Sequence, residues 1–173
     1  MDDDTLRRRV LDLLAKRYPH KLAEHVASDL GSIGNIKIER VRNWIYKGTK
    51  LSGLDLYLLM RKYNFVHDWV MSAGRKWNCQ ICHESSLGIP EMDDDTLRRN
   101  VLDLLGKRYP RKLAEHVASD LGSVGNIKIE RVRNWLYKGT KLSGFDLYLL
   151  MRRYNFIRNY FAYRKGNSNI LSS

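Results

Sequence analysis

The chain has 173 residues, of which 43% are hydrophobic and 29% are charged, and its formal net charge is +12. This apolar content is typical of a folded chain, and no run of sequence approaches the roughly 18 apolar residues of a membrane-spanning helix. The excess of positive charge favours a polyanionic partner. The N-terminus is acidic where a secretory signal would be basic, so we expect a cytoplasmic protein with no membrane partner.

A repeat covers most of the chain, because residues 1–66 recur as residues 92–157. Each copy carries 13 Lys and Arg against 8 Asp and Glu, so each is basic by itself. The copies differ only at Arg9/Asn100, Ala15/Gly106, His20/Arg111, Ile33/Val124, Ile45/Leu136, Leu54/Phe145, Lys62/Arg153 and Val66/Ile157. We therefore expect two tandem modules, with the chain divided into module 1 over 1–70, a linker over 71–91, module 2 over 92–164 and a frayed tail over 165–173.

The first helix of each copy is expected to begin at an acidic cluster and to end before a proline. Residues 2–4 are all Asp, which suits a helix N-terminus, and Asp4 is the expected N-cap. Apolar residues then recur at helical spacing from Leu6 to Leu14. Pro19 ends the helix because the residue before a proline avoids helical dihedrals.

Two further helices are expected before Gly48. The second covers about residues 21–30, with Gly31 as its C-cap, and residues 32–35 form a turn. The third covers about residues 36–47. One side of this third helix is apolar, and the opposite side carries charged and polar residues.

The fourth helix has the clearest start. Ser52 and Asp55 form an S-x-x-D capping box, with Leu51 and Leu56 placed as its hydrophobic staple. The apolar run that follows predicts a central core helix, which we expect to continue through Phe65. No segment alternates with period two over a useful length. The fold class is therefore expected to be all-α, with four or five short helices in each module.

Helices two to four resemble the helix-turn-helix domain of the phage repressor and Cro-like (XRE-type) family. The residues responsible are the Leu- and Ala-rich helix over 22–31, the V-x-x-W-x-x-x-G element of Val41, Trp44 and Gly48, and the capped apolar helix over 54–60. That family shows a Leu/Ala-rich helix ending at Gly, then V-x-x-W, a glycine one turn later and a leucine-rich helix.

The resemblance covers residues 20–63 and 111–154 and departs from the family in one place. Gly31 and Val41 are ten residues apart, about four more than the family's tight turn allows. We therefore expect either an enlarged loop between the two helices or a second helix that begins earlier.

The resemblance implies that the helix over 36–47 enters the major groove of double-stranded DNA. In that position Arg40 suits guanine, Asn43 suits adenine and Glu39 could accept from cytosine, while nearby Lys and Tyr side chains suit phosphates. The alternative is an ordinary solvated helix face. The expected DNA-binding residues are Lys37, Glu39, Arg40, Asn43, Tyr46, Lys47 and Lys50, with Lys128, Glu130, Arg131, Asn134, Tyr137, Lys138 and Lys141 in the second copy.

Other conspicuous side chains have ordinary explanations. Trp44 and Trp135 lie at core spacing, so we expect them to be buried. His25 and His116 are expected at the surface or half-buried rather than as ligands or catalytic bases. No nucleophile, base and orienting residue recur together, so we expect no enzyme.

The linker holds both cysteines, Cys79 and Cys82, followed by His83. This C-x-x-C-H spacing is that of a c-type haem attachment site. Haem attachment requires export, and the acidic N-terminus does not resemble an export signal, so we do not expect a haem site. A zinc knuckle would use the two thiolates with either His83 or His67 as a third ligand, one ligand fewer than a closed structural site takes. Two free thiols in a connector are favoured over zinc, so we expect no cofactor.

These features predict a sequence-specific, double-stranded DNA-binding transcriptional regulator of the repressor kind. It would act at the nucleoid as an intrachain pseudo-dimer on two similar half-sites, and further pairing of two chains stays open. One alternative is a nucleic-acid binder without sequence preference, either DNA-architectural or RNA-binding, and another is a helical protein-interaction adaptor. The basic, aromatic segment 158–165 is expected to pack on its own module, with self-association as the alternative.

Overall fold

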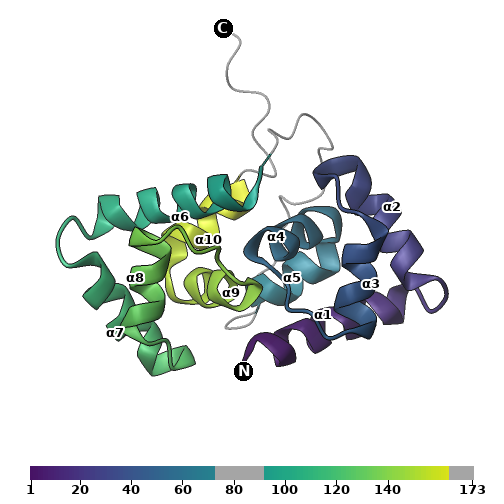
Figure 1. Ribbon diagram of the computed structural model, residues 1–173, viewed down its shortest axis with the longest axis horizontal. Helices are drawn as coiled ribbons and strands as arrows, with labels where there is room; N and C mark the ends of the chain where they lie inside the picture. Colours follow the sequence, from purple (N-terminus) through teal and green to yellow (C-terminus); the bar gives the residue numbers. More distant parts are fainter. Residues whose placement is uncertain (73–91, 164–173) are drawn as a thin grey trace, which may run out of the picture.

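The computed structural model describes residues 1–72 and 92–163, and these residues form an all-helical fold, as predicted. They contain ten α-helices and no β-strand, with five helices in each copy (Figure 1). Every helix in these ranges is too short or too polar to span a bilayer. The helices are α1 (Asp3–Arg17), α2 (Leu22–Gly34), α3 (Ile38–Tyr46), α4 (Gly53–Lys62), α5 (Asn64–Ser72), α6 (Asp94–Arg108), α7 (Leu113–Gly125), α8 (Ile129–Tyr137), α9 (Gly144–Arg153) and α10 (Asn155–Tyr163).

Helix α1 is capped at its N-terminus by Asp2, whose carboxylate accepts a hydrogen bond from the Thr5 backbone N–H at 2.8 Å. The prediction that Asp4 would be the N-cap is therefore wrong. Asp4 lies in the first turn instead, where its negative charge favours the helix N-terminus. The helix ends at Arg17, before Pro19, as predicted.

Helix α2 continues one turn beyond Gly31, so the predicted C-cap there and the predicted turn over 32–35 are wrong. Packing accounts for the extra turn, because Gly34 lies so close to α4 that an added Cβ would stand 2.3 Å from Leu58 Cδ1. The helix ends at Gly34, and its C-cap Asn35 has a left-handed backbone (φ 51°) that asparagine tolerates better than most residues. Only three residues then separate α2 from α3, so the excess length between the two helices is helical.

Helix α4 starts at the predicted capping box. Ser52 Oγ accepts from the Asp55 N–H at 3.1 Å, and the Asp55 carboxylate accepts from the Ser52 N–H at 2.8 Å. The prediction that this helix continues through residue 65 is wrong, because Tyr63 adopts an extended backbone and ends the helix. The buried Tyr63 hydroxyl donates to Asp29 Oδ2 at 2.9 Å, which attaches the junction between α4 and α5 to α2.

The two copies pair through α4, α9 and the residues just before these helices, a contact that we call the pairing seam. The Gly53 N–H donates to Leu142 O at 2.7 Å, and the Gly144 N–H donates to Leu51 O at 2.7 Å. Each copy donates one of these two equivalent bonds and accepts the other, so an approximate twofold axis relates the copies at the seam. In Figure 1, α4 and α9 lie near the centre, while α2 and α7 lie at opposite ends.

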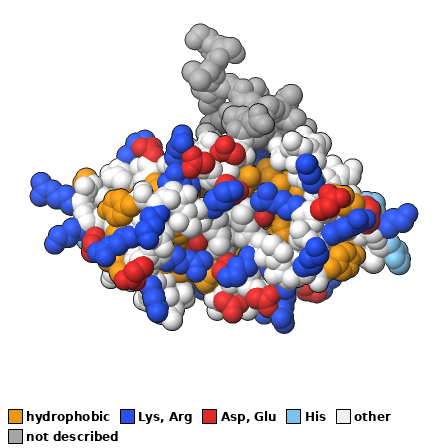
Figure 2. Space-filling model, viewed as in Figure 1, with side chains coloured by type: hydrophobic (Ala, Val, Ile, Leu, Met, Phe, Trp, Pro, Cys, Tyr) orange, Lys and Arg blue, Asp and Glu red, His pale blue; other side chains and the backbone are white. Residues whose placement is uncertain are grey.

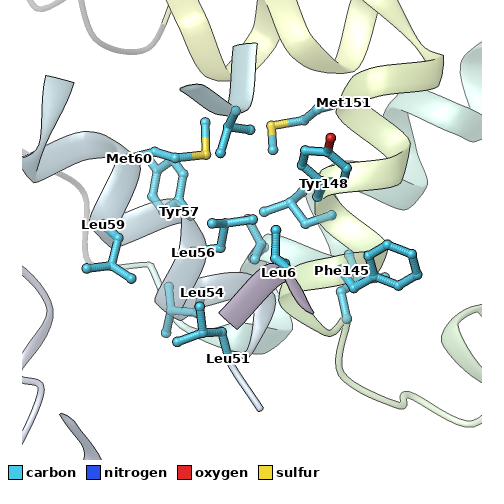
Figure 3. Close-up of a cluster of buried hydrophobic side chains, with 14 of the residues drawn as sticks. Leu6, Leu51, Leu54, Leu56, Tyr57, Leu59, Met60, Phe145, Tyr148 and Met151 are labelled. Atoms are coloured by element: carbon cyan, nitrogen blue, oxygen red, sulfur yellow. The ribbon is translucent and has the colours of Figure 1, made fainter. Parts of the chain in front are cut away.

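The buried apolar side chains of both copies form a single cluster across the pairing seam, where side chains from α4 and α9 meet (Figure 3). Aromatic rings also cross it. Trp69 of α5 stacks on Tyr148 of α9, with 6.0 Å between ring centroids, and Phe161 of α10 meets Tyr57 of α4 at 5.4 Å. The described part of the segment 158–165 therefore packs, as predicted, but against both copies rather than only its own.

Candidate nucleic-acid interface

Helix α3 turns an apolar side inwards and a polar side outwards. Val41 and Trp44 on the inner side are 0% and 1% exposed, and the burial of Trp44 and Trp135 confirms the predicted core role. Helix α8 repeats this arrangement. Of the predicted DNA-binding residues, Arg40, Asn43, Arg131 and Asn134 are half-buried, and the exposed ones are Lys37, Glu39, Tyr46, Lys47, Lys50, Lys128, Glu130, Tyr137, Lys138 and Lys141.

Tyr46 and Tyr137 are unusual because they are 75% and 77% exposed. In the described ranges, Met1 and Val124 are the only other large hydrophobic side chains classed as exposed. A tyrosine ring in water gains nothing from packing, whereas its hydroxyl group and flat ring suit contact with a polar partner. The outer side of α3 and α8 therefore presents groups that the fold itself does not use.

Three charged residues in or next to α3 are exposed, as Tyr46 is. Lys37, Glu39 and Lys47 make no hydrogen bond or ion pair with another described residue through their side chains. Lys37 precedes the helix and Lys47 follows it, so the two cations lie at opposite ends of the same short helix. This spacing suits an extended anion better than a point charge.

Arg40 is partly exposed and also makes contacts within the fold. Its guanidinium is 2.8 Å from Asp55 Oδ1 and donates to Ser52 Oγ at 3.1 Å, both at the start of α4. In the second copy, Arg131 makes the matching contacts and also lies 3.5 Å from Asp3 Oδ2 of the first copy. Both guanidinium groups are therefore engaged within the fold, although the two arginine side chains remain 40% and 39% exposed.

The side chains of Asp55 and Asp146, whose carboxylates hold these arginines, are each 2% exposed. Burial raises the pKa of Asp55, and the Arg40 guanidinium acts in the opposite direction without cancelling that rise. Burial likewise raises the pKa of Asp146 against the effect of Arg131. Each carboxylate depends on its arginine, because removing the counter-charge would leave a buried charge uncompensated.

Lys50 and Lys141 lie in the segments before α4 and α9 and pair with acidic residues of the first turns of α1 and α6. Lys50 Nζ is 3.2 Å from Asp3 Oδ2, and Lys141 Nζ is 3.1 Å from Asp94 Oδ2. The lysine side chains are 68% and 71% exposed, so water screens these pairs strongly and they are weak. Both lysines can therefore also meet an external anion.

Sequence reasoning missed Arg42 and Arg133, which lie on α3 and α8 beside the outer face. Each pairs with a glutamate of the preceding helix, Glu24 at 3.1 Å and Glu115 at 3.2 Å. These pairs attach the two helices of each copy to one another. Complementary charges on consecutive helices were visible in the sequence, but their spacing along the chain does not show that they meet.

The described residues offer no metal centre. His25 and His116 are exposed, as predicted, and stack on Tyr18 and Tyr109 with ring centroids 5.6 and 5.4 Å apart. No group of three or more His, Cys, Asp or Glu side chains in these ranges could hold a metal ion. Of the zinc ligands considered from the sequence, Cys79, Cys82 and His83 lie outside the described residues. The alternative third ligand, His67, is buried in α5 with Nδ1 3.2 Å from Asp68 Oδ1.

Positive charge is distributed over both copies. On the face shown in Figure 2, Lys and Arg side chains are spread over the whole width of the molecule, with Asp and Glu between them. Each copy therefore contributes to the net charge of +12. The sequence matches no protein family model, and neither a similar curated protein nor a similar solved structure was found.

Proposed function

We propose that the protein is a sequence-specific, double-stranded DNA-binding transcriptional regulator, with α3 and α8 as its two reading helices. The observation that carries this proposal is the pair of matching outer faces on α3 and α8, which expose tyrosine and lysine side chains and are held in one body by the pairing seam. The proposal places the protein at the nucleoid, in the cytoplasm.

In this proposal, different residues contact the phosphates and the bases. Lys37 and Lys47 neutralise phosphates and supply affinity that is independent of sequence. Asn43 and Glu39 contact base edges, where an amide suits adenine and a carboxylate suits the cytosine amino group. Tyr46 adds a hydroxyl donor at the end of the helix. The matching residues of α8 do the same on the second half-site.

The near-twofold relation between the copies supports an inverted repeat as the binding site. A twofold axis presents α3 and α8 to the duplex in opposite senses, so each half-site is read from the opposite strand. The exposed residues of the two helices are the same in both copies, so the two half-sites have nearly the same sequence. A direct repeat would instead require copies related by translation.

Selection of bound duplexes from a random pool tests this proposal. We expect enrichment of one inverted repeat whose half-sites lie about one helical turn apart, roughly 34–36 Å. Binding without any enriched sequence would point to the nucleic-acid binder without sequence preference. If the protein binds no duplex at either low or high salt, that result would favour the alternative function, a helical protein-interaction adaptor.

Two pairs of substitutions then separate base contacts from phosphate contacts. Asn43→Ala/Asn134→Ala should cost about 1–3 kcal/mol of binding free energy per half-site and relax the preference at one base pair of each. Lys47→Ala/Lys138→Ala should weaken binding to all duplexes alike and make the affinity less dependent on salt.

A matched control removes the same charge from another surface. Lys16→Ala/Lys107→Ala takes two lysines that are each 71% exposed from α1 and α6. We expect this control to change affinity much less than the substitutions on α3 and α8. Equal losses in both would show that net charge, rather than the outer faces of these helices, determines binding.

A further inference from the structure

We infer that Arg40 and Arg131 are positioning residues, which fix α3 and α8 relative to each other through the pairing seam and so set the spacing between the two half-sites. This inference rests on the proposed DNA-binding function and gives the two arginines a role other than base reading. Each arginine belongs to a reading helix and ends at the turn where the copies pair.

The first step is the contact between Arg40 and the start of α4. The guanidinium reaches Asp55 Oδ1 at 2.8 Å and Ser52 Oγ at 3.1 Å. Ser52 forms an antiparallel bridge with Ser143 of the other copy, and the next residue, Gly53, donates a backbone hydrogen bond across the seam. One side chain therefore attaches α3 to the turn that pairs the copies.

The second step is a row of charges that crosses from one copy to the other. Lys50 lies 3.2 Å from Asp3 Oδ2, and that oxygen lies 3.5 Å from the Arg131 guanidinium of the second copy. Arg131 in turn lies 2.8 Å from Asp146 Oδ1. The exposed Lys50 contributes little to this row, whereas the contact of Asp3 with Arg131 joins a 9% exposed side chain to a 39% exposed one and is screened less. Helix α8 is thus attached to α1 of the first copy as well as to α9.

Burial makes these attachments difficult to release. The side chains of Asp55 and Asp146 are each 2% exposed. Turning either arginine towards a base would strand a buried carboxylate without its counter-charge, which costs more than an exposed ion pair contributes. Tyr46 and Lys47 are not paired with a buried carboxylate, so they can contact DNA while the arginines hold the helix in place.

Spacing is the property that these attachments should control, because DNA is helical. One added base pair moves a half-site by about 3.4 Å along the axis and turns it by about 35°. Two firmly attached reading helices match one spacing well. Two loosely attached helices can follow a half-site that has moved, so they lose little affinity at neighbouring spacings.

The test uses the full chain and duplexes whose selected half-sites are moved one base pair closer together or further apart. Arg40→Gln/Arg131→Gln removes the guanidinium groups. Asp55→Asn/Asp146→Asn leaves both arginines in the chain and keeps an oxygen acceptor for the capping bond, but removes the charge that holds each arginine.

The matched control is Arg42→Gln/Arg133→Gln. It changes the same residue type on the same two helices, but these arginines pair with Glu24 and Glu115 of their own copy, away from the seam. It therefore separates the positioning role from a general effect of removing two positive charges near the DNA.

We expect wild-type affinity to fall by at least about tenfold at a spacing that differs by one base pair. In both the Arg40→Gln/Arg131→Gln and the Asp55→Asn/Asp146→Asn chains, we expect that fall to shrink to about threefold or less, with base preference within each half-site unchanged. The control should discriminate between spacings as the wild type does.

Two results with DNA would overturn the inference. In the first, base preference changes in the arginine variant but not in the aspartate variant, which would make the arginines base readers. In the second, both folded variants discriminate between spacings as strongly as the wild type, which would mean that the attachments do not control the geometry.

A distance measurement without DNA distinguishes failure of this inference from failure of the proposed function. Spin labels at Lys47→Cys and Lys138→Cys, in a chain that carries Cys79→Ser and Cys82→Ser, report the separation of α3 and α8. We expect one narrow distance distribution, which broadens when either seam variant is added but not with the control. If no duplex is bound, the proposed function fails while the broadening still supports the positioning role; unchanged distributions in both variants overturn that role.

Discussion

Alanine at Gly53 and Gly144 should weaken the pairing seam, because the backbones of the two copies touch at these glycines. An added Cβ at Gly53 would lie 3.1 Å from Leu142 O and 3.1 Å from Leu97 Cδ2, and at Gly144 it would lie 3.1 Å from Leu51 O. Each of these carbonyl oxygens also accepts the 2.7 Å hydrogen bond of the seam. It therefore cannot move away from the new methyl group without lengthening that bond.

The expected cost of the double substitution is about 3 kcal/mol of unfolding free energy. Two weakened hydrogen bonds cost about 2 kcal/mol together. Crowding at the seam costs about 2 kcal/mol more. Alanine also restricts the unfolded chain, which returns about 1 kcal/mol over the two positions. For a chain of this size we expect the melting temperature to fall by roughly 6–12 °C.

Thermal and denaturant unfolding, followed by far-ultraviolet circular dichroism, would measure this change. Gly106→Ala is the matched control, because an added Cβ there meets no described atom within 4 Å and the first copy already carries Ala15 at the same position. We expect this control to be more stable than the wild type by about 0.5–1 kcal/mol. A Gly53→Ala/Gly144→Ala chain that unfolds within about 0.5 kcal/mol of the wild type would refute the reasoning.

Gly34→Ala should lower the free energy of unfolding by about 1–3 kcal/mol in the same assay, because its Cβ would stand 2.3 Å from Cδ1 of the buried Leu58; an unchanged midpoint would contradict that packing. Ser52→Ala should cost about 1 kcal/mol, since it removes the N-cap acceptor of α4, and restoration by threonine would check this cause. Asp55→Asn/Asp146→Asn should make stability fall more steeply on acidification, measured by denaturant unfolding at a series of pH values. Burial raises the pKa of both carboxyls above the unfolded value of 3.8, so the native wild type takes up their protons first and gains stability as the pH falls through the raised pKa towards 3.8. Equal slopes in variant and wild type would contradict this sign.

Features that depend on neighbouring residues could be predicted from the sequence. The capping box of Ser52 and Asp55, the helix end before Pro19 and the burial of Trp44 all follow from short spacings, and the structure confirms each. The all-helical fold follows from the same periodicity. The continuation of α2 past Gly31 could not be predicted in this way, because its cause is close packing against a helix much later in the chain.

The candidate site could be predicted only in part, for a related reason. Helical periodicity places Arg40 on the polar side of α3, but it does not show that Asp55 lies beside that edge of the helix. The pairing seam leaves even less trace in the sequence, because its central hydrogen bonds join backbone groups that every residue except proline possesses. Only Gly53 and Gly144 hint at the close approach, and glycine before an apolar run is equally typical of an ordinary loop.

Both halves of the pairing seam belong to the same chain, so the paired form does not depend on how much protein is present. A homodimer held by the same contact would dissociate on dilution, and occupancy of a ligand that needs both halves would then rise with the square of the subunit concentration. In this chain, pairing is a unimolecular step, and occupancy of such a ligand rises in simple proportion to concentration. A single newly made molecule therefore already holds the complete two-sided unit, without waiting to meet a second one.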